Sequence, residues 1–128
     1  MMRMRTDQPA ATDHREPTLF DVGLAPTIEP IEPHPDSLEA AFDEFHRRNP
    51  WVYDALVRLA RDLRSRGRER VGIGMLFEVL RWQWALATTD ASSDFRLNNN
   101  YRSRYARLIM DNEADLDGMF ETRKLTAA

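Results

Sequence analysis

The stretch "PWVYDALVRLARDLRSRG", residues 50–67, decides the fold class of this chain. Its apolar side chains recur every three or four positions, which is the period of one face of an α-helix. These positions are Val52, Ala55, Leu56, Leu59 and Leu63. Asn49 followed by Pro50 is a helix start, with Asn as the cap and Pro at the first helical position, and Gly67 is a stop. The stretch predicts an amphipathic helix that packs against other helices.

Two further apolar patterns flank it. Upstream, Leu38, Ala41, Phe42 and Phe45 share one helical face, and Asp36 or Ser37 is placed to cap that helix. Downstream, "MLFEVLRWQWALATT" (75–89) is apolar around most of its circumference, with Glu78, Arg81 and Ala85 as a thin solvent strip. We interpret this second stretch as the central core helix, and its tryptophans as core residues.

The stretch "LNNNYRSRYARLIM" (97–110) predicts a basic helix capped by Asn98 or Asn99. Its inner face is expected to consist of Tyr101, Tyr105, Leu108 and Ile109. A second face, expected to be an exposed strip, carries Asn100, Arg104 and Arg107, with Arg102 and Ser103 beside it.

Short strands are expected at "RERVGIG" (68–74) and "MFETRKL" (119–125), and "FRL" (95–97) is a candidate pairing partner. The order of elements resembles a winged helix-turn-helix, in which a third helix enters the major groove beside a β-hairpin wing. The predicted fold is therefore mainly α, a winged helix-turn-helix-like domain of about four helices plus short β strands over residues 37–128. Two features depart from that pattern. The connection of about ten residues before the basic helix exceeds a helix-turn-helix turn, and at most one strand follows the helix.

Residues 1–36 have a different composition. They contain six of the seven prolines and three arginines against seven acidic residues, with no amphipathic period, so we expect a disordered N-terminal arm. Within it, Glu16-Pro17-Thr18-Leu19-Phe20 resembles the bacterial sliding-clamp-binding pentapeptide, although Glu16 replaces the usual Gln. That resemblance makes Glu16, Leu19 and Phe20 candidate contacts to a host protein. The alternative is that Leu19, Phe20 and Val22 fasten the arm onto the domain.

The charge distribution points toward nucleic acid. The net charge is -3, yet residues 47–107 hold 13 arginines against six acidic residues. Arginine suits bidentate recognition of phosphate and guanine. The candidate DNA-binding residues are Asn99, Asn100, Arg102, Ser103, Arg104 and Arg107 on the basic helix, and Arg64, Arg66, Arg68 and Arg70 before it. The alternatives are a plain surface helix with solvated arginines and, for the second group, cations that favour a helix C-terminus.

The sequence gives little support for a catalytic site or a metal-binding site. The chain has no Cys, and of its three histidines two lie in the arm and His46 stands alone. "EADLDGMFETRK" (113–124) imitates a calcium loop, but Lys124 occupies the position that must supply a bidentate carboxylate. We predict a non-enzymatic protein without cofactor or metal. No run of about 18 apolar residues exists, so we also expect no membrane span and a cytoplasmic location.

Together, "NPWVYDALVRLARDL" (49–63), "GIGMLFEVLRWQWAL" (72–86) and "FRLNNNYRSRYARLIM" (95–110) resemble a family of small phage and prophage proteins of actinobacterial hosts. The resemblance covers roughly residues 40–125. It implies a bacterial or phage setting and a role in regulation or DNA metabolism, and it transfers no catalytic residue. Two functions follow as expectations: a protein that binds duplex DNA, with a homodimer left open, or an adaptor or inhibitor that docks on a host protein.

Overall fold

The computed structural model describes residues 19–21, 23–31, 37–88 and 97–121, and within them the chain is mainly helical, as predicted. The described residues form the α-helices α2 (Leu38–Arg48), α3 (Pro50–Ser65), α4 (Ile73–Ala87) and α5 (Arg102–Asn112). Two 3₁₀ turns, η2 (Asn99–Tyr101) and η3 (Ala114–Leu116), flank α5.

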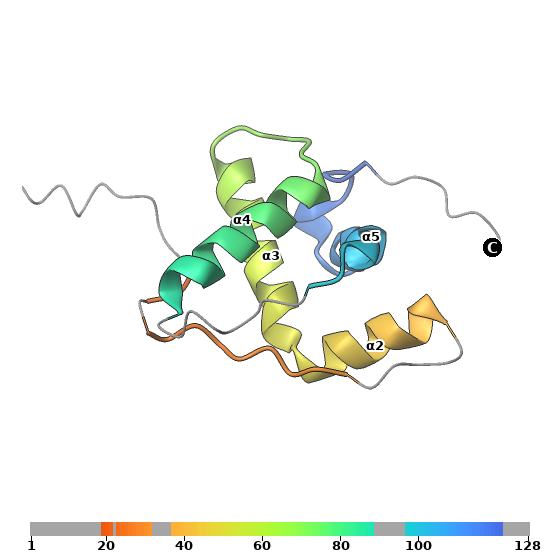
Figure 1. The fold of residues 1–128 in the computed structure, drawn as a ribbon. Coiled ribbons are helices and arrows are strands. Elements are labelled where there is room, and N and C mark those ends of the chain that lie inside the picture. Colours follow the sequence, from red (N-terminus) through yellow and green to blue (C-terminus); the bar gives the residue numbers. More distant parts are fainter. Residues whose placement is uncertain (1–18, 22, 32–36, 89–96, 122–128) are drawn as a thin grey trace, which may run out of the picture.

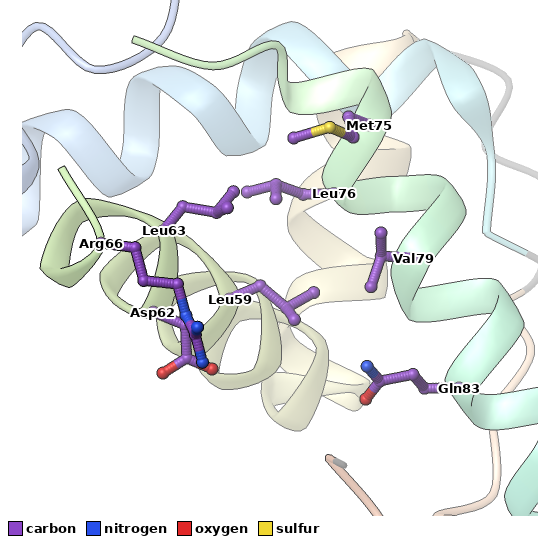
Figure 2. Close-up of a pocket in the computed structure, with 8 residues that line it drawn as sticks. All are labelled: Leu59, Asp62, Leu63, Arg66, Met75, Leu76, Val79 and Gln83. Carbon is purple, nitrogen blue, oxygen red and sulfur yellow. The ribbon is translucent and has the colours of Figure 1, made fainter. Parts of the chain in front are cut away.

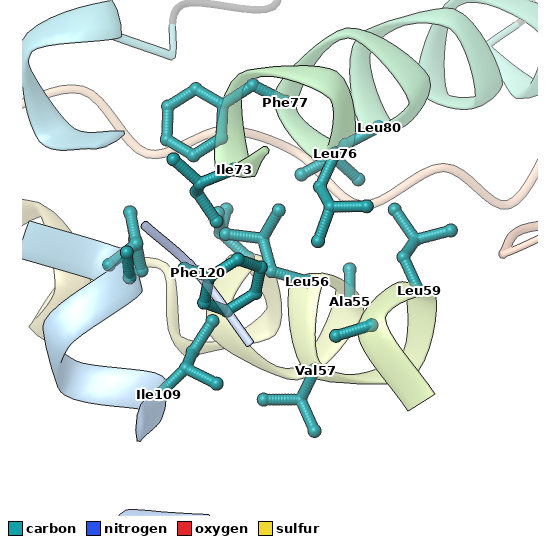
Figure 3. Packing of buried hydrophobic residues seen from close by; sticks show 14 of the residues in the cluster. Ala55, Leu56, Val57, Leu59, Ile73, Leu76, Phe77, Leu80, Ile109 and Phe120 are labelled. Carbon is teal, nitrogen blue, oxygen red and sulfur yellow. The ribbon is translucent and has the colours of Figure 1, made fainter. Parts of the chain in front are cut away.

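Helix α3 is the centre of the arrangement (Figure 1). It contacts all three other helices, and α5 also packs on α4. Figure 3 shows the side chains that meet between them, with Leu56 from α3, Phe77 from α4 and Ile109 from α5 pointing into one cluster together with Phe120. All four are almost fully buried, so apolar burial between these helices is the main force that fixes their arrangement.

The predicted helix boundaries are confirmed at three ends. The hydroxyl of Ser37 accepts a hydrogen bond from the Ala40 amide (3.0 Å) and caps α2. Gly67 follows α3 with φ at 92°, in the left-handed region; its amide reaches the Arg64 carbonyl at 3.0 Å, as in a glycine-terminated helix. The Asn98 side chain accepts from the Asn100 amide (2.8 Å) and caps η2.

Asn49 behaves differently from the prediction. Pro50 does begin α3, but the Asn49 side chain makes no capping hydrogen bond. It is fully buried and faces residue 29 instead, where its Oδ1 accepts from the Glu29 amide (2.7 Å) and its Nδ2 donates to the Glu29 carbonyl (3.0 Å). Because a buried amide is stable only when its hydrogen bonds are satisfied, Asn49 fastens the N-terminal segment to the helices.

Residues 19–21 and 23–31, which the sequence assigned to the arm, therefore lie against the helices in the structure. The Trp84 indole donates to the Pro26 carbonyl (2.7 Å), and the Leu19 amide donates to Gln83 Oε1 (2.7 Å). Phe20 meets the Trp51 ring edge to face, with centroids 5.7 Å apart. The composition of this segment predicts that its backbone groups face solvent, but in the structure several of them form hydrogen bonds with side chains of the helices. The other arm residues, including Val22, lie outside the described part of the chain.

The predicted strands are also corrected. Among the described residues there is no strand, only one isolated parallel bridge between Val71 and Phe120, in which the Val71 amide donates to the Met119 carbonyl (3.0 Å). Residues 95–96 and 122–125 of the expected strands lie outside the described residues. Ile73, which seemed to alternate with Val71 in a strand, is the first residue of α4 and is buried there, because its position also matches the helical period that continues at Phe77.

Helix α4 is only partly the core helix that was expected. Leu76, Phe77, Leu80 and Trp84 are buried, but Trp82 is 66% exposed, so its assignment to the core was wrong. Where a helix is apolar nearly all round, the sequence does not say which side lacks a neighbour.

Candidate nucleic-acid interface

The flanks of α5 are covered by neighbouring helices. Arg104 donates from Nε to Glu39 Oε1 on α2 (2.9 Å), and its side chain is only 17% exposed. Arg107 is also half-buried. The expected exposed strip through Asn100, Arg104 and Arg107 is therefore wrong for the two arginines, since α5 lies against α2 as well as α4 and α3. Asn100 alone of the three is exposed.

The start of α5 lies against α4. Arg81 on α4 donates to Asn99 Oδ1 and to the Leu97 carbonyl (2.7 Å), and its Nη1 is 2.8 Å from Glu78 Oε2. Glu78 and Arg81, three positions apart on α4, thus form an ion pair. Arg102 is more exposed than Arg104: its side chain is 40% exposed, and its Nη2 is 3.9 Å from Glu78 Oε2.

The inner face of α5 follows the prediction. Tyr101, Tyr105 and Ile109 are buried, and Leu108 packs at the edge of the core. The Tyr105 ring lies 4.8 Å from that of Phe42. These contacts account for the tyrosines of the basic helix without a ligand. Ser103 is half-buried.

The second predicted group, Arg64, Arg66, Arg68 and Arg70, lies at the end of α3 and in the connection to α4, and all four residues are exposed. No ion pair links Arg64, Arg68 or Arg70 to any acidic residue that the structure describes.

Arg61, one turn before this group, is bound within the protein. It reaches Asp115 Oδ2 at 2.9 Å and Glu113 Oε1 at 2.7 Å. The same guanidinium holds the pKa of the Asp115 carboxyl below its usual value. Tyr53 joins this cluster by donating to Glu113 Oε2 (2.8 Å). The acidic residues 113 and 115 thus occupy one arginine and tie α3 to the segment after α5.

Arg102 lies close to the start of α4, and the arginines of the α3–α4 connection precede that start in the chain. Arg102 lies across the first turn of α4, where a Cβ on Gly74 would be 3.5 Å from the guanidinium carbon, an ordinary van der Waals distance. Arg70 is only two residues before Gly72, the N-cap of that helix. We call the surface made of Arg64, Arg66, Arg68, Arg70 and Arg102 the basic edge. The sequence shows these five arginines, but no signal in it predicts that Arg102 lies at the start of α4.

The candidate partner residues of the N-terminal segment are placed differently. Leu19 and Phe20 are half-buried on the domain, as in the alternative reading of the sequence, and Glu16 lies outside the described residues. Docking on a host protein through them would require both to leave Gln83 and Trp51. That role stays a prediction.

The described residues hold no group of three or more His, Asp or Glu side chains arranged to bind a metal ion. None of their helices is long and apolar enough to cross a membrane. Comparison of the chain with models of known protein families, with characterised proteins and with solved structures finds no match.

Proposed function

We propose that this protein binds duplex DNA, without catalysing a reaction, through the basic edge. The observation that carries the proposal is the exposure of four arginines within residues 64–70, of which Arg64, Arg68 and Arg70 form no ion pair in the described part of the chain. Exposed arginines arranged along one edge neutralise successive phosphates and release counterions, which supplies most of the affinity of non-specific DNA binding.

In this proposal the domain acts as a winged-helix-like module of phage type, with α5 as its recognition helix. Recognition helices of helix-turn-helix proteins contact base edges with their N-terminal residues. At the start of α5, Asn100 is exposed and Arg102 is partly exposed, whereas Arg104 is held by Glu39. We therefore place the DNA contacts at the N-terminal end of α5, with Asn99 and Ser103 beside them, and give Arg104 and Arg107 a structural role.

A salt-dependent binding titration tests this proposal. Fluorescence anisotropy of a short labelled duplex is measured at several salt concentrations for the full chain and for Arg68→Ala with Arg70→Ala. Losing two phosphate contacts should weaken binding by about tenfold or more at moderate salt and flatten the logarithmic salt slope by about two units.

A matched control removes the same charge elsewhere. Arg47 and Arg48 end α2, where both pair with Glu44, so Arg47→Ala with Arg48→Ala lowers the net charge equally. This variant should retain most of the affinity and nearly the whole salt slope. The proposal fails if the full chain does not bind duplex DNA at low salt, or if the two double variants weaken binding equally.

A further inference from the structure

Helix α4 carries an apolar stripe along its outer side. Met75, Val79, Trp82 and Leu86 follow one another at intervals of four, three and four residues, which places them on one helical face. Trp82 is 66% exposed, Leu86 58% and Met75 47%. We call these four residues the α4 stripe. The apolar pattern of the sequence had predicted a core position for this side of α4, and none of the proposed DNA contacts involves the stripe.

A groove adjoins the N-terminal half of the stripe. It lies between α3 and α4 and has a volume of about 350 Å³. Figure 2 shows Leu59 and Leu63 on one side of it and Met75 and Val79 on the other. At the opposite end of α4, Leu24 is 70% exposed; it is held close to the helix end because the Gly23 amide donates to the Ala87 carbonyl (2.5 Å). The N-terminal end of α4 thus adjoins a groove, and exposed leucines, Leu24 and Leu86, lie at its C-terminal end.

We propose that a second copy of this chain covers the α4 stripe, with the two α4 helices packed antiparallel. The intervals of four, three and four read the same in both directions. A two-fold axis perpendicular to the helix therefore places Met75 opposite Leu86 of the second copy, and Val79 opposite Trp82 of the second copy. The leucine end of each copy then meets the groove end of the other, as an interface between identical surfaces requires.

The charges of α4 allow this self-association. Its only charged residues are Glu78 and Arg81, which are 2.8 Å apart and satisfy each other beside the stripe. Two α4 stripes can therefore approach each other without repulsion between like charges. Two copies of a face that carried a net charge would repel each other.

The exposed apolar area also fits a second copy. A fully open tryptophan presents about 250 Å², and Trp82, Leu86, Met75 and Leu24 together leave on the order of 500 Å² in contact with water, near the upper limit for one patch on a monomer. A stable dimer buries about 800 Å² per partner. These four residues supply more than half of that area, and Gln83, Ala85 and the groove rim adjoin them.

Sedimentation equilibrium of the full chain, without nucleic acid, tests the dimer separately from DNA binding. We expect a reversible dimer in the micromolar range. Trp82→Glu should weaken it by at least about tenfold, because central aromatic residues dominate interface energies, and should leave the helical circular dichroism unchanged. Ala114→Glu is the control: it adds the same charge at an exposed position of η3 and should leave the dimer intact.

Cysteine cross-linking tests the orientation, since the natural chain has no Cys. In the antiparallel dimer the two copies of residue 86 lie roughly 16 Å apart along the helices, beyond the Cα separation of about 7 Å that a disulfide allows. Leu86→Cys alone should not cross-link, whereas a mixture of Met75→Cys and Leu86→Cys chains should.

Three results would overturn the proposal. They are a monomer at every concentration, a dimer that Trp82→Glu and Ala114→Glu weaken equally, and self-cross-linking of Leu86→Cys. If the chain is monomeric and deletion of residues 1–18 newly exposes the stripe to a hydrophobic dye, the occupant is the chain's own N-terminal segment and the dimer is rejected.

Discussion

Helix α5 and the connection between α3 and α4 are both rich in arginine, but their arginines have different surroundings. Arg104 is held by Glu39 with little exposure, and Arg107 is half-buried. Arg68 and Arg70 are exposed, and neither has an ion pair among the described residues. An arginine is available to a ligand only where no neighbouring element covers its flank, and that property depends on tertiary packing, not on residue type.

The same contrast separates Arg61 from Arg64 within one helix. Arg61 faces the acidic residues after α5 and binds Glu113 and Asp115, while Arg64, almost one turn later, is exposed. The basic edge thus begins at Arg64, the next arginine of α3 after the one that Glu113 and Asp115 bind. Arg61 and Arg104 thus belong to a packed set of arginines, whereas Arg64, Arg68 and Arg70 form an available set.

The largest expected effect concerns the inner face of α5. Tyr105→Ala should destabilise the protein by about 3–5 kcal/mol, because it removes a fully buried ring that packs on Phe42 and Phe77. Urea unfolding measures the change. If the loss is below about 1 kcal/mol, α5 is not a packed helix and the contrast with the connection disappears.

Tyr105→Phe is the matched variant. The Tyr105 hydroxyl is buried and has no hydrogen-bond partner within the described structure. Removing an unsatisfied buried hydroxyl while keeping the ring is neutral or stabilising. We therefore expect this variant to be at least as stable as the natural protein, and a clear destabilisation would show that the hydroxyl does have a partner.

Some of these features of the fold could be predicted from the sequence, and others could not. The helix ends at Ser37, Gly67 and Asn98 were predictable, because caps and left-handed glycines act over a few residues. The inner face of α5 was predictable as well, because periodicity records burial. The role of Asn49 was not, since its partner at residue 29 is 20 positions away.

The candidate site was predictable only as a set of residues. Arginines at 64–70 and at 102 are visible in the sequence, but Arg102 lies near the start of α4 only because α5 packs on that helix beside Gly74. The exposed side of α4 was equally hidden, because an apolar position is compatible with a core contact and with an uncovered surface. Availability of a side chain is decided by non-local packing, which a helical wheel does not contain.

Alkaline titration gives the second largest effect. Burial raises the pKa of Tyr101 and Tyr105, and burial together with the Glu113 carboxylate raises the pKa of Tyr53 to about 12. All three tyrosines of the chain therefore hold their protons more tightly in the folded state than in the unfolded one.

The sign of the stability change follows from linkage. A raised tyrosine pKa stabilises the fold fully below the ordinary value of 10.0, and this contribution is lost as the pH rises toward about 12. Unfolding midpoints in urea should fall over that interval, and tyrosinate absorbance should rise later in native than in unfolded protein. A native tyrosine that ionises at its ordinary pKa would contradict the packing of α5 or of Tyr53.

Single arginine replacements compare the two sets directly. Arg104→Ala should reduce the free energy of unfolding by about 1 kcal/mol, because it removes a partly exposed ion pair and a packed aliphatic stem. Arg68→Ala should change it by less than about 0.5 kcal/mol, as expected of an exposed residue without such contacts. Arg104→Met, which keeps most of the stem, should recover part of the loss. Equal effects of the two alanine variants would remove the distinction.

The smallest effect is expected at the acidic segment that occupies Arg61. Hydrogen bonds from Arg61 lower the pKa of Asp115, whose usual value is 3.8, so the pair stabilises the fold above that pH and the contribution is lost as the pH falls below it. The groups are exposed, so salt should screen most of the effect. Acid unfolding of Asp115→Asn at low salt should show a shallower loss of stability below this value than the natural protein, with the difference disappearing at high salt. If the two proteins lose stability in parallel at low salt, Asp115 does not hold Arg61, and Glu113 alone ties this arginine of α3 to the segment after α5.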